Sequence, residues 1–502
     1  MSAINIEAPE VTLAPDLLKL GENDFVFIDV SSIQEGKIPK PFPEVCEDDS
    51  YGWGREGFVR MPFSSKRLRK NGTSEAEFVQ DCLRKLSKPQ RSIQDVSRLI
   101  ESYQHESSYN GSLYDLFNHH LSPQKRLHYL NFVIPEMAKL ALRLNEVITQ
   151  PICRLQAGVN GSLTFSQEQV ASLLANAFFC TYPPHNPACA PKMQLFSFNR
   201  LFLQGHHSKI EKLKCIMHYF DCITRKMPDG IISIRRASNH ETVSFSSMTD
   251  QLCSLIVHGD GRIEDTNNEM LEVDFADKYI GGLVLTVGCV QEEIRFVISP
   301  ELMVAMLVCE RMEDNEAISI IGTEKFSNYE GFAKTFRFVE KGESESVIRD
   351  RYCRILSEVV AIDAINLRDP ITQFENDNIL REIMKAYVGF QISNGLNRPI
   401  ATGNWGCGAF GGDRQLKSLI QLIAASAQGR NEVHYFTFHG AEFASQLQRI
   451  YRILIKKKTS IGTLTQLLLS YQRHIEPEKE FKVFDFVIRE VSRLRLSNCE
   501  LS

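Results

Sequence analysis

The sequence predicts an α/β fold, a sheet flanked by helices, with a helical region before it. Short stretches of strand type recur after residue 230, and helical stretches separate them. From about residue 70 to 225, by contrast, the apolar residues follow helical spacing. The chain has 502 residues, of which 43% are hydrophobic and 24% charged, so it is long enough for two or more domains.

The first 60 residues are expected to be loosely structured. Pro39, Pro41 and Pro43 lie close together, and proline lacks the backbone donor that helices and central strands need. The helical accessory domain is then expected over residues 61–230.

Two helices of this domain have clear limits. Ser166 and Gln169 have capping-box spacing, apolar residues follow at helical intervals, and Pro183 ends the pattern. A second helix is expected over Glu211–Arg225, before the turn residues Pro228–Gly230.

Residues 231–502 are expected to form the α/β domain. Its apolar or alternating stretches predict strands at Ile231–Ile234, Leu271–Phe275, Ala317–Ile321, Val359–Ile362 and Val433–Phe438. Helices are expected between them, near Pro300–Cys309, Ile379–Tyr387 and Arg414–Ala425.

Composition excludes several classes of function. The formal net charge of -5 gives no global positive field, so direct DNA binding is not expected. The thirteen cysteines include no CxxC pair and the histidines no HExxH, so no metal site is expected and the thiols indicate a reducing compartment. The N-terminus lacks signal-peptide character and the apolar runs are short, so the prediction is a soluble, intracellular protein without a membrane segment.

A glycine turn followed by acidic residues is the first candidate site. Gly281 and Gly282 lack Cβ atoms and bring backbone close to a ligand. Leu283 and seven further residues separate them from Gln291, Glu292 and Glu293. Adjacent helical residues point about 100° apart, so one glutamate is expected to act as acid and base while the other positions the substrate. The alternative is an exposed acidic pair at a helix start.

The second candidate is the glycine-rich stretch Thr402–Asp413. Its five glycines precede an amphipathic helix with Asp413 as the expected N-cap, and such a loop presents successive N–H groups to a diphosphate. The same stretch contains GxGxxG, which leaves a dinucleotide-dependent oxidoreductase as an alternative. Against it, Pro399 makes Arg398–Ala401 a poor central strand, and Glu432 precedes rather than ends the next strand. A flexible surface loop is the remaining interpretation.

A third candidate is Ile263–Glu264. An apolar side chain beside a carboxylate suits an adenine, by packing and by accepting from its amino group. The alternative is a turn residue beside a solvated acid.

Together and in order, these stretches resemble the poly(ADP-ribose) glycohydrolase family. The resemblance covers roughly residues 60–490 and includes Val273–Ala276, Gln291–Phe296, Ile362–Ala364 and Tyr435–Phe438. It implies a macrodomain, a mixed sheet between helices, joined to a helical accessory domain. It also implies hydrolysis of ribose–ribose bonds in poly(ADP-ribose), releasing ADP-ribose.

The resemblance also implies roles for individual residues. Glu293 matches the catalytic acid, which protonates the departing ribose oxygen and then activates water. Glu292 matches the residue that orients the ribose, and Gln291 supports it. The remaining expected substrate contacts are Ile263 and Glu264 at the adenine, Phe438 on the adenosine, Asn404, Gly408, Ala409 and Phe410 at the diphosphate, and Asp274, Asp277, Gly281, Gly282 and Phe332.

Three residues depart from the family pattern. Leu283 replaces a third glycine and is strained if that position needs a positive φ. Asp277 replaces an asparagine, so an acceptor replaces a group that also donates. Phe332 replaces a tyrosine and loses a hydroxyl contact. These departures leave open an alternative function, a binding module for ADP-ribose that does not hydrolyse.

The expected partners are poly(ADP-ribose) and ADP-ribosylated proteins. No cofactor and no metal are expected, and neither DNA nor a membrane is an expected partner. We expect a monomer located in the nucleus, the cytoplasm or both.

Overall fold

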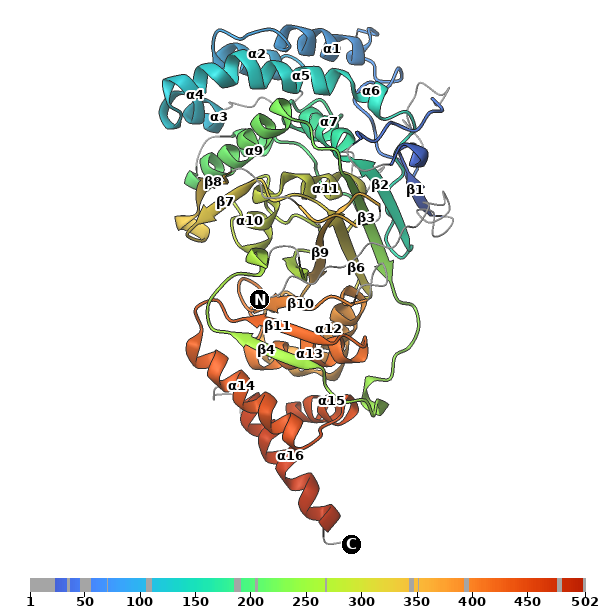
Figure 1. Ribbon diagram of the computed structural model, residues 1–502, viewed down its shortest axis with the longest axis vertical. Helices are drawn as coiled ribbons and strands as arrows, with labels where there is room; N and C mark the ends of the chain where they lie inside the picture. The colour runs from blue at the N-terminus through green and yellow to red at the C-terminus, as the bar shows by residue number, and fades with distance from the viewer. Residues whose placement is uncertain are drawn as a thin grey trace. The chain divides into compact units, whose positions relative to one another are not determined.

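The chain divides into two compact units (Figure 1). Unit 1 comprises Met1–Arg235, Tyr279–Arg311 and Ile320–Leu356, and unit 2 comprises Arg236–Lys278, Met312–Ser319 and Ser357–Ser502. The computed structural model describes residues 23–33, 37–45, 56–69, 71–104, 111–184, 191–203, 206–266, 269–342, 347–350, 352–391, 397–475 and 481–499. Nine strands follow one another in a mixed sheet in the order β1-β2-β3-β6-β9-β5-β10-β11-β4, and β7 pairs with β8.

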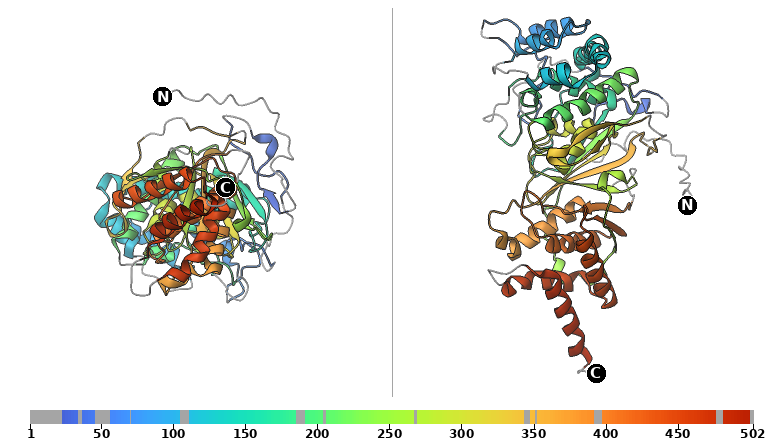
Figure 2. Two further views of the ribbon diagram at one scale, coloured as in Figure 1. Left: turned by 90° about the horizontal axis from the view of Figure 1, so that it is seen from below. Right: turned by 90° about the vertical axis from the view of Figure 1, so that its left-hand side faces the viewer.

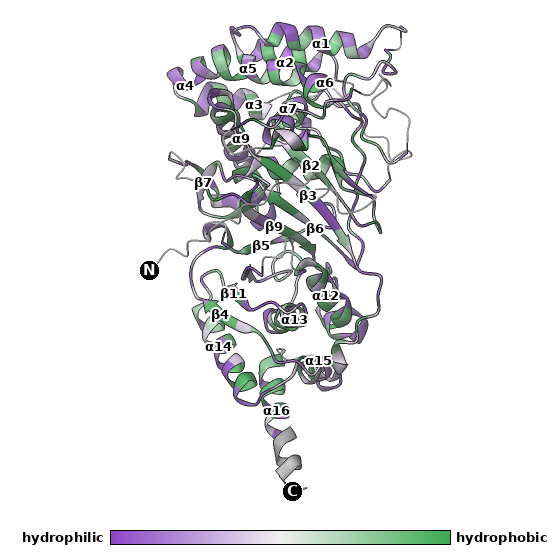
Figure 3. Ribbon diagram, turned by 45° about the vertical axis from the view of Figure 1, so that its right-hand side comes forward, coloured by the Kyte–Doolittle hydropathy of each residue, from purple (hydrophilic) through white to green (hydrophobic). Residues whose placement is uncertain are grey.

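Unit 1 is mainly helical. In Figures 1 and 2, α5 packs between α1 and α7, and α9 lies against α10. Figure 3 shows the amphipathic character of α1, whose apolar face is buried. The helices are α1 (Glu75–Leu86), α2 (Ile93–Glu101), α3 (Gly111–Asp115), α4 (Pro123–His128), α5 (Ile134–Leu142), α6 (Leu144–Val147), α7 (Gln167–Phe178), α8 (Asn199–Phe202), α9 (His207–Arg225), α10 (Gln291–Ile298) and α11 (Val304–Val308).

The predicted start of α7 is confirmed. Ser166 Oγ accepts from Gln169 N at 3.1 Å, and Gln169 Oε1 accepts from Ser166 N at 2.8 Å, which is a complete capping box. The helix predicted over Glu211–Arg225 is also present and begins earlier, as α9.

The N-terminal segment contains a strand that the sequence pattern did not indicate. Residues 1–22, 34–36 and 46–55 of the segment predicted to be loose lie outside the described residues. Within the described part, Asp24–Val26 forms β1, which pairs in parallel with β2 (Gly161–Ser166). The two strands lie far apart in sequence, so no local pattern reveals their pairing.

The strands predicted after residue 230 are all present, with longer or shifted limits. They are β3 (Ile231–Ser238), β5 (Leu271–Ala276), β6 (Glu316–Gly322), β9 (Ile355–Asp363) and β11 (Glu432–Phe436). Four further strands were not predicted: β4 (Ser254–His258), β7 (Ser327–Glu330), β8 (Arg337–Glu340) and β10 (Ile400–Gly403).

Unit 2 contains the run β9-β5-β10-β11-β4, in which every neighbouring pair is parallel. The carboxyl ends of these strands therefore meet at one edge of the sheet. The sheet packs with α12 (Asn376–Gly389), α13 (Arg414–Ala427), α14 (Ala441–Lys456), α15 (Ile461–Ser470) and α16 (Val483–Cys499), the last three of which lie together in Figure 2.

The expectation that Arg398–Ala401 is a poor central strand was wrong. Strand β10 lies between β5 and β11. Pro399 precedes its first residue, so its missing N–H costs no strand hydrogen bond, and its carbonyl accepts from Leu271 N at 2.9 Å.

None of the helices in the described ranges combines the length and the apolar character that crossing a lipid bilayer requires.

Candidate active site

The glycine turn of unit 1 needs glycine at both positions. Gly281 has a φ of +87° and Gly282 a φ of +50°. A Cβ on Gly281 would lie 2.8 Å from Met306 Sδ. A Cβ on Gly282 would overlap Glu292 Oε2 and lie 2.8 Å from Glu293 Oε1. The close approach of both carboxylates therefore depends on the absence of a side chain at Gly282.

The first turn of α10 holds Glu293 in a fixed orientation. Val290, the N-cap residue, has no side-chain acceptor for the N–H groups of the first turn. The Glu293 carboxylate folds back instead, accepting from Val290 N at 2.8 Å and from Leu283 N at 3.0 Å. Each carboxylate oxygen thus has a backbone donor, and the side chain is 5% exposed.

Glu292 is held by the other side of the same turn. Its Oε1 accepts from Gly281 N at 2.6 Å, and the side chain is buried. Although adjacent on the helix, the two glutamates accept hydrogen bonds from different backbone N–H groups of the turn and the loop that follows it. Gln291, the first residue of α10, is half-buried.

Leu283 carries no backbone strain. It is absent from the described residues with positive φ, so the strain expected if the position required one does not arise. Its side chain is 58% exposed while its N–H holds Glu293. Phe332 lies in the same unit, just after β7, and is half-buried.

The other candidate residues gather at the edge of unit 2 where the parallel strands end. Ile263–Glu264 follow β4, Asp277 follows β5, Asn404 follows β10, and Phe438 lies two residues beyond β11. Asp274 is a buried residue of β5 itself. Ligands of open α/β sheets bind outside the carboxyl ends of the strands, so we name these residues the binding edge.

The loop after β10 is closed by its own backbone. Gly412 N donates to Gly406 O at 2.9 Å, and Gly411 N donates to Gly408 O at 3.1 Å. Asn404 Nδ2 donates to Thr437 O at 3.0 Å, which ties the start of the loop to the end of β11.

The tip of this loop offers donors. The N–H groups of Gly408, Ala409 and Phe410 have no acceptor among the described residues. Gly408 and Ala409 are exposed, so these consecutive donors suit an anion such as a diphosphate. The predicted N-cap is confirmed, because Asp413 Oδ1 accepts from Leu416 N at 2.8 Å.

Phe438 is an exposed aromatic in an unusual backbone conformation. Its φ is +53°, and that of His439 is +62°, a region that residues with a Cβ rarely adopt. The residue is 45% exposed. Strain of this kind is frequent at ligand sites, and the packing of Phe438 on the adenosine stays a prediction.

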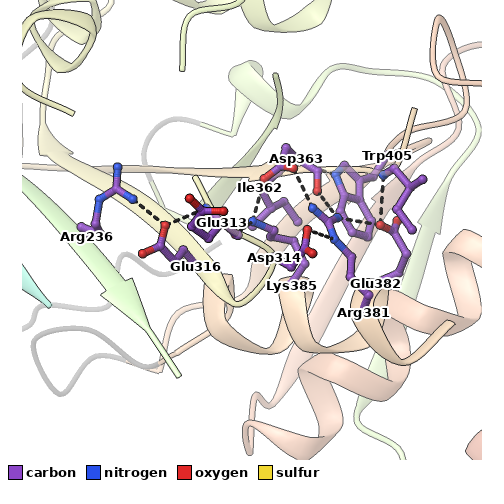
Figure 4. A network of polar contacts seen from close by, with 11 residues as sticks. Arg236, Glu313, Asp314, Glu316, Ile362, Asp363, Arg381, Glu382, Lys385 and Trp405 are labelled. Atoms are coloured by element: carbon purple, nitrogen blue, oxygen red, sulfur yellow. Dashed lines mark hydrogen bonds and ion pairs between the residues drawn. The ribbon is translucent and has the colours of Figure 1, made fainter. Parts of the chain in front are cut away.

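A buried polar network lies beneath the binding edge (Figure 4). Arg381 forms ion pairs with Asp363 at 2.7 Å and with Glu382 at 2.7 Å, and Lys385 pairs with Asp363 at 2.6 Å. Trp405 Nε1 donates to Ile362 O at 2.9 Å. The network holds the end of β9 and the glycine-rich loop after β10 in fixed positions.

Lys417 supports the same loop from α13. Its Nζ lies 4.0 Å from the centre of the Trp405 ring and forms an ion pair with Glu382. Burial lowers the pKa of this lysine well below its usual value. A Cβ on Gly406 would lie 3.2 Å from Lys417 Nζ, so the lysine packs directly under the loop.

Lys417 was not among the residues predicted for the site, although the sequence carries a signal for it. Lys417 follows Leu416 and precedes Ile420 within a predicted helix, and a lysine so close to the apolar face indicates a buried charge that requires a partner. No cluster of three or more histidine, cysteine, aspartate or glutamate side chains in the described ranges is arranged to hold a metal ion.

Comparison with known proteins gives consistent matches. The family model described as "Poly (ADP-ribose) glycohydrolase (PARG), helical domain" matches residues 121–236, and "Poly (ADP-ribose) glycohydrolase (PARG), Macro domain fold" matches residues 242–445. Poly(ADP-ribose) glycohydrolase 1 of Arabidopsis thaliana is 32% identical over 469 residues, which cover 76% of this chain and 85% of that protein. Poly(ADP-ribose) glycohydrolase 1 of Caenorhabditis elegans is 36% identical over 367 residues, which cover 70% of this chain and 45% of that protein.

Proposed function

Because this chain belongs to the poly(ADP-ribose) glycohydrolase family, we propose that it hydrolyses the ribose–ribose glycosidic bonds of poly(ADP-ribose) and releases ADP-ribose. The same matches confirm the predicted macrodomain fold with a helical domain before it. The observation that carries the proposal is the convergence of two buried carboxylates on a turn whose two positive-φ positions favour glycine.

Glu293 acts as the acid and base of the proposed mechanism. It protonates the departing ribose oxygen, and as a carboxylate it then takes a proton from the water that attacks the oxocarbenium-like carbon. Its backbone hydrogen bonds to Leu283 N and Val290 N support this role, because they hold the carboxyl group in one orientation before substrate arrives.

Glu292 and Gln291 position the ribose in this mechanism. The hydrogen bond from Gly281 N to Glu292 fixes the second carboxylate on the same turn. A carboxylate that accepts from the sugar hydroxyls orients the bond to be cleaved, so removing it affects turnover as well as binding.

The binding edge of unit 2 holds the ADP-ribose moiety in the proposal. The consecutive N–H groups of Gly408–Phe410 bind the diphosphate, assisted by Asn404, which orders the start of the loop. Ile263 and Glu264 contact the adenine, and Phe438 packs on the adenosine. Asp274, Asp277 and Phe332 complete the set of proposed substrate contacts.

Replacement of Glu293 by glutamine tests the assignment. We expect Glu293→Gln to lower kcat by about 10³-fold, within the range for loss of a general acid, while ADP-ribose affinity changes less than about threefold. The assay incubates the protein with poly(ADP-ribose) and measures released ADP-ribose; isothermal titration gives the affinity.

Glu168→Gln is the matched control, since Glu168 also lies in the first turn of a helix but outside the candidate site. We expect it to keep wild-type kcat. Full activity in Glu293→Gln would remove the proposed acid. A wild-type protein that binds ADP-ribose without turnover would instead establish a binding module.

We further propose that ADP-ribosylated proteins are the natural carriers of the substrate, that the protein acts without a cofactor or metal and without binding DNA, and that it is a monomer of the nucleus or cytoplasm. The ten cysteines whose side chains the structure describes are free thiols, which supports a reducing compartment. Sedimentation with and without substrate tests the oligomeric state.

A further inference from the structure

Lys212 is a buried cation with three backbone partners. It lies on α9 with a side-chain exposure of 0%. Its Nζ donates to Val284 O at 2.8 Å, to Thr286 O at 2.7 Å and to Gly288 O at 2.6 Å. An ammonium group has three protons, and each of them has a carbonyl acceptor here.

These three carbonyls belong to the segment that holds the proposed acid. We name residues 283–290 the glutamate loop. Its first residue, Leu283, and its last, Val290, donate their N–H groups to the two oxygens of Glu293. The ends of the loop therefore hold the carboxylate, and Lys212 holds the middle of the loop.

We propose that Lys212 is a positioning residue for catalysis: by binding three carbonyls of the glutamate loop, it fixes the backbone donors that orient Glu293. The inference rests on the proposed role of Glu293 as acid and base.

The glutamate loop has little room to adjust without this lysine. A Cβ on Gly288 would lie 2.6 Å from Glu293 Oε1 and 2.5 Å from the Leu283 Cβ, so loop and carboxylate are closely packed. Removing the ammonium group leaves buried carbonyls without their donor, which favours a rearranged loop. A displacement of the acid by about 1 Å is enough to cost about 10²-fold in rate.

The charge of Lys212 adds a dependence on pH. Burial lowers its pKa to about 8; Cys289, Glu293 and Cys215 raise it in part, and the neighbouring Lys209 lowers it. A neutral amine has two N–H groups, so above this pH one of the three carbonyls loses its donor. Turnover is therefore expected to fall above about pH 8 as the loop loosens.

Lys209 provides a matched control on the same helix. It is also buried, and its Nζ donates to Arg200 O at 2.8 Å and to Leu203 O at 3.0 Å. Those carbonyls belong to a different segment, outside the glutamate loop. Lys209→Met and Lys212→Met thus each remove a buried ammonium group from α9. Of these two groups, the one on Lys212 contacts the glutamate loop.

The test compares steady-state kinetics of these two variants on poly(ADP-ribose). We expect Lys212→Met to lower kcat by about 10²-fold with ADP-ribose affinity within about threefold, and to lose the decline of kcat above pH 8. Lys209→Met should keep kcat within about threefold and should keep the decline, moved to somewhat higher pH because the Lys209 charge that lowers the pKa of Lys212 is gone. Amide exchange of Leu283 and Val290 should accelerate in Lys212→Met alone.

A folded Lys212→Met protein with wild-type kcat would overturn the proposal, as would equal losses in both variants. Should Lys212→Met fail to fold, the natural protein provides the test. Its kcat and the protection of the Leu283 and Val290 amides against exchange must then fall together near pH 8. A kcat or an amide protection that stays constant up to pH 9.5 rejects the positioning role of Lys212. If Glu293→Gln is fully active, the proposed acid fails, and the exchange data alone then judge whether Lys212 holds the loop.

Discussion

At the scale of single residues, the backbone conformation of Gly282 and its lack of a side chain shape the candidate site. Its φ is +50°, and its missing Cβ leaves the space in which Glu292 and Glu293 approach the backbone. Leu283, the next residue, has a side chain in solvent and contributes its N–H. A side chain at position 282 would meet the two carboxylates, whereas the side chain at position 283 points into solvent.

Gly282→Ala is predicted to lower kcat by about 10²-fold. The new methyl group overlaps the Glu292 carboxylate and displaces Glu293, so the acid loses its orientation. Poly(ADP-ribose) turnover and the free energy of unfolding are the measurements. Gly342→Ala, where a Cβ meets nothing within 4 Å and φ is not positive, is the control. Wild-type turnover in Gly282→Ala would show that the carboxylates tolerate displacement.

Phe438→Gly separates strain from binding. Glycine adopts the φ of +53° without strain, and this gain offsets its greater freedom in the unfolded chain, so stability should change by less than about 1 kcal/mol. Loss of the ring should weaken ADP-ribose binding about tenfold, the effect of a lost base–aromatic contact. Titration calorimetry measures the ADP-ribose affinity of Phe438→Gly and of the control Phe25→Ala. Phe25 is another exposed phenylalanine. Unchanged affinity in Phe438→Gly would remove Phe438 from the site.

At the scale of elements, helix starts decide the geometry of both loops. In α10 the N-cap is a valine, so the Glu293 carboxylate accepts from the N-cap N–H, and the fold uses the proposed catalytic group to complete its own helix. In α13 the N-cap is an aspartate, and the N–H groups of Gly408–Phe410 in the loop before it have no acceptor within the described part of the chain.

The N-cap of α13 gives a prediction with an internal control. Asp413→Ala should lower the free energy of unfolding by about 1 kcal/mol, because Leu416 N loses its acceptor. Asp413→Asn keeps an oxygen acceptor, so it should lower the free energy of unfolding by only a few tenths of the amount lost in Asp413→Ala. Urea denaturation of the two variants measures the difference. Equal stability of both would mean that solvent replaces the cap without loss.

At the scale of the whole molecule, buried ionisable groups make stability depend on pH. Glu301 is fully buried, accepting from Gln167 Nε2 at 2.8 Å and from Glu324 N at 2.8 Å. Burial raises its pKa to about 8 from an ordinary value near 4.5. The folded protein therefore binds this proton more tightly than the unfolded chain.

This raised pKa predicts a loss of stability as pH increases. The contribution of Glu301 is fully present below pH 4.5 and is lost as pH rises through 8. Between pH 5 and 7.5 the wild type should lose up to about 3 kcal/mol more than Glu301→Gln, which cannot ionise. Urea unfolding of both proteins at the two pH values provides the comparison, and parallel pH profiles would contradict the assignment.

Some features were readable from the sequence because they are local. Ser166 and Gln169 lie three residues apart, and their capping box formed as predicted. The same holds for Asp413 at the start of α13 and for the alternation in β5. The motif ending in Glu293 was also visible, because glycine and carboxylate residues lie at fixed spacing along one short segment.

Features that depend on residues distant in sequence, such as strand pairing and long-range hydrogen bonds, were decided by the tertiary structure. Strand β1 exists because β2 pairs with it, and β10 is central because Pro399 falls just outside the ladder. Lys212 reaches the glutamate loop from a helix about seventy residues earlier. Sequence alone thus determined the chemical groups and the local turns that carry them. Their orientation came from buried long-range hydrogen bonds, which no periodicity along the chain encodes.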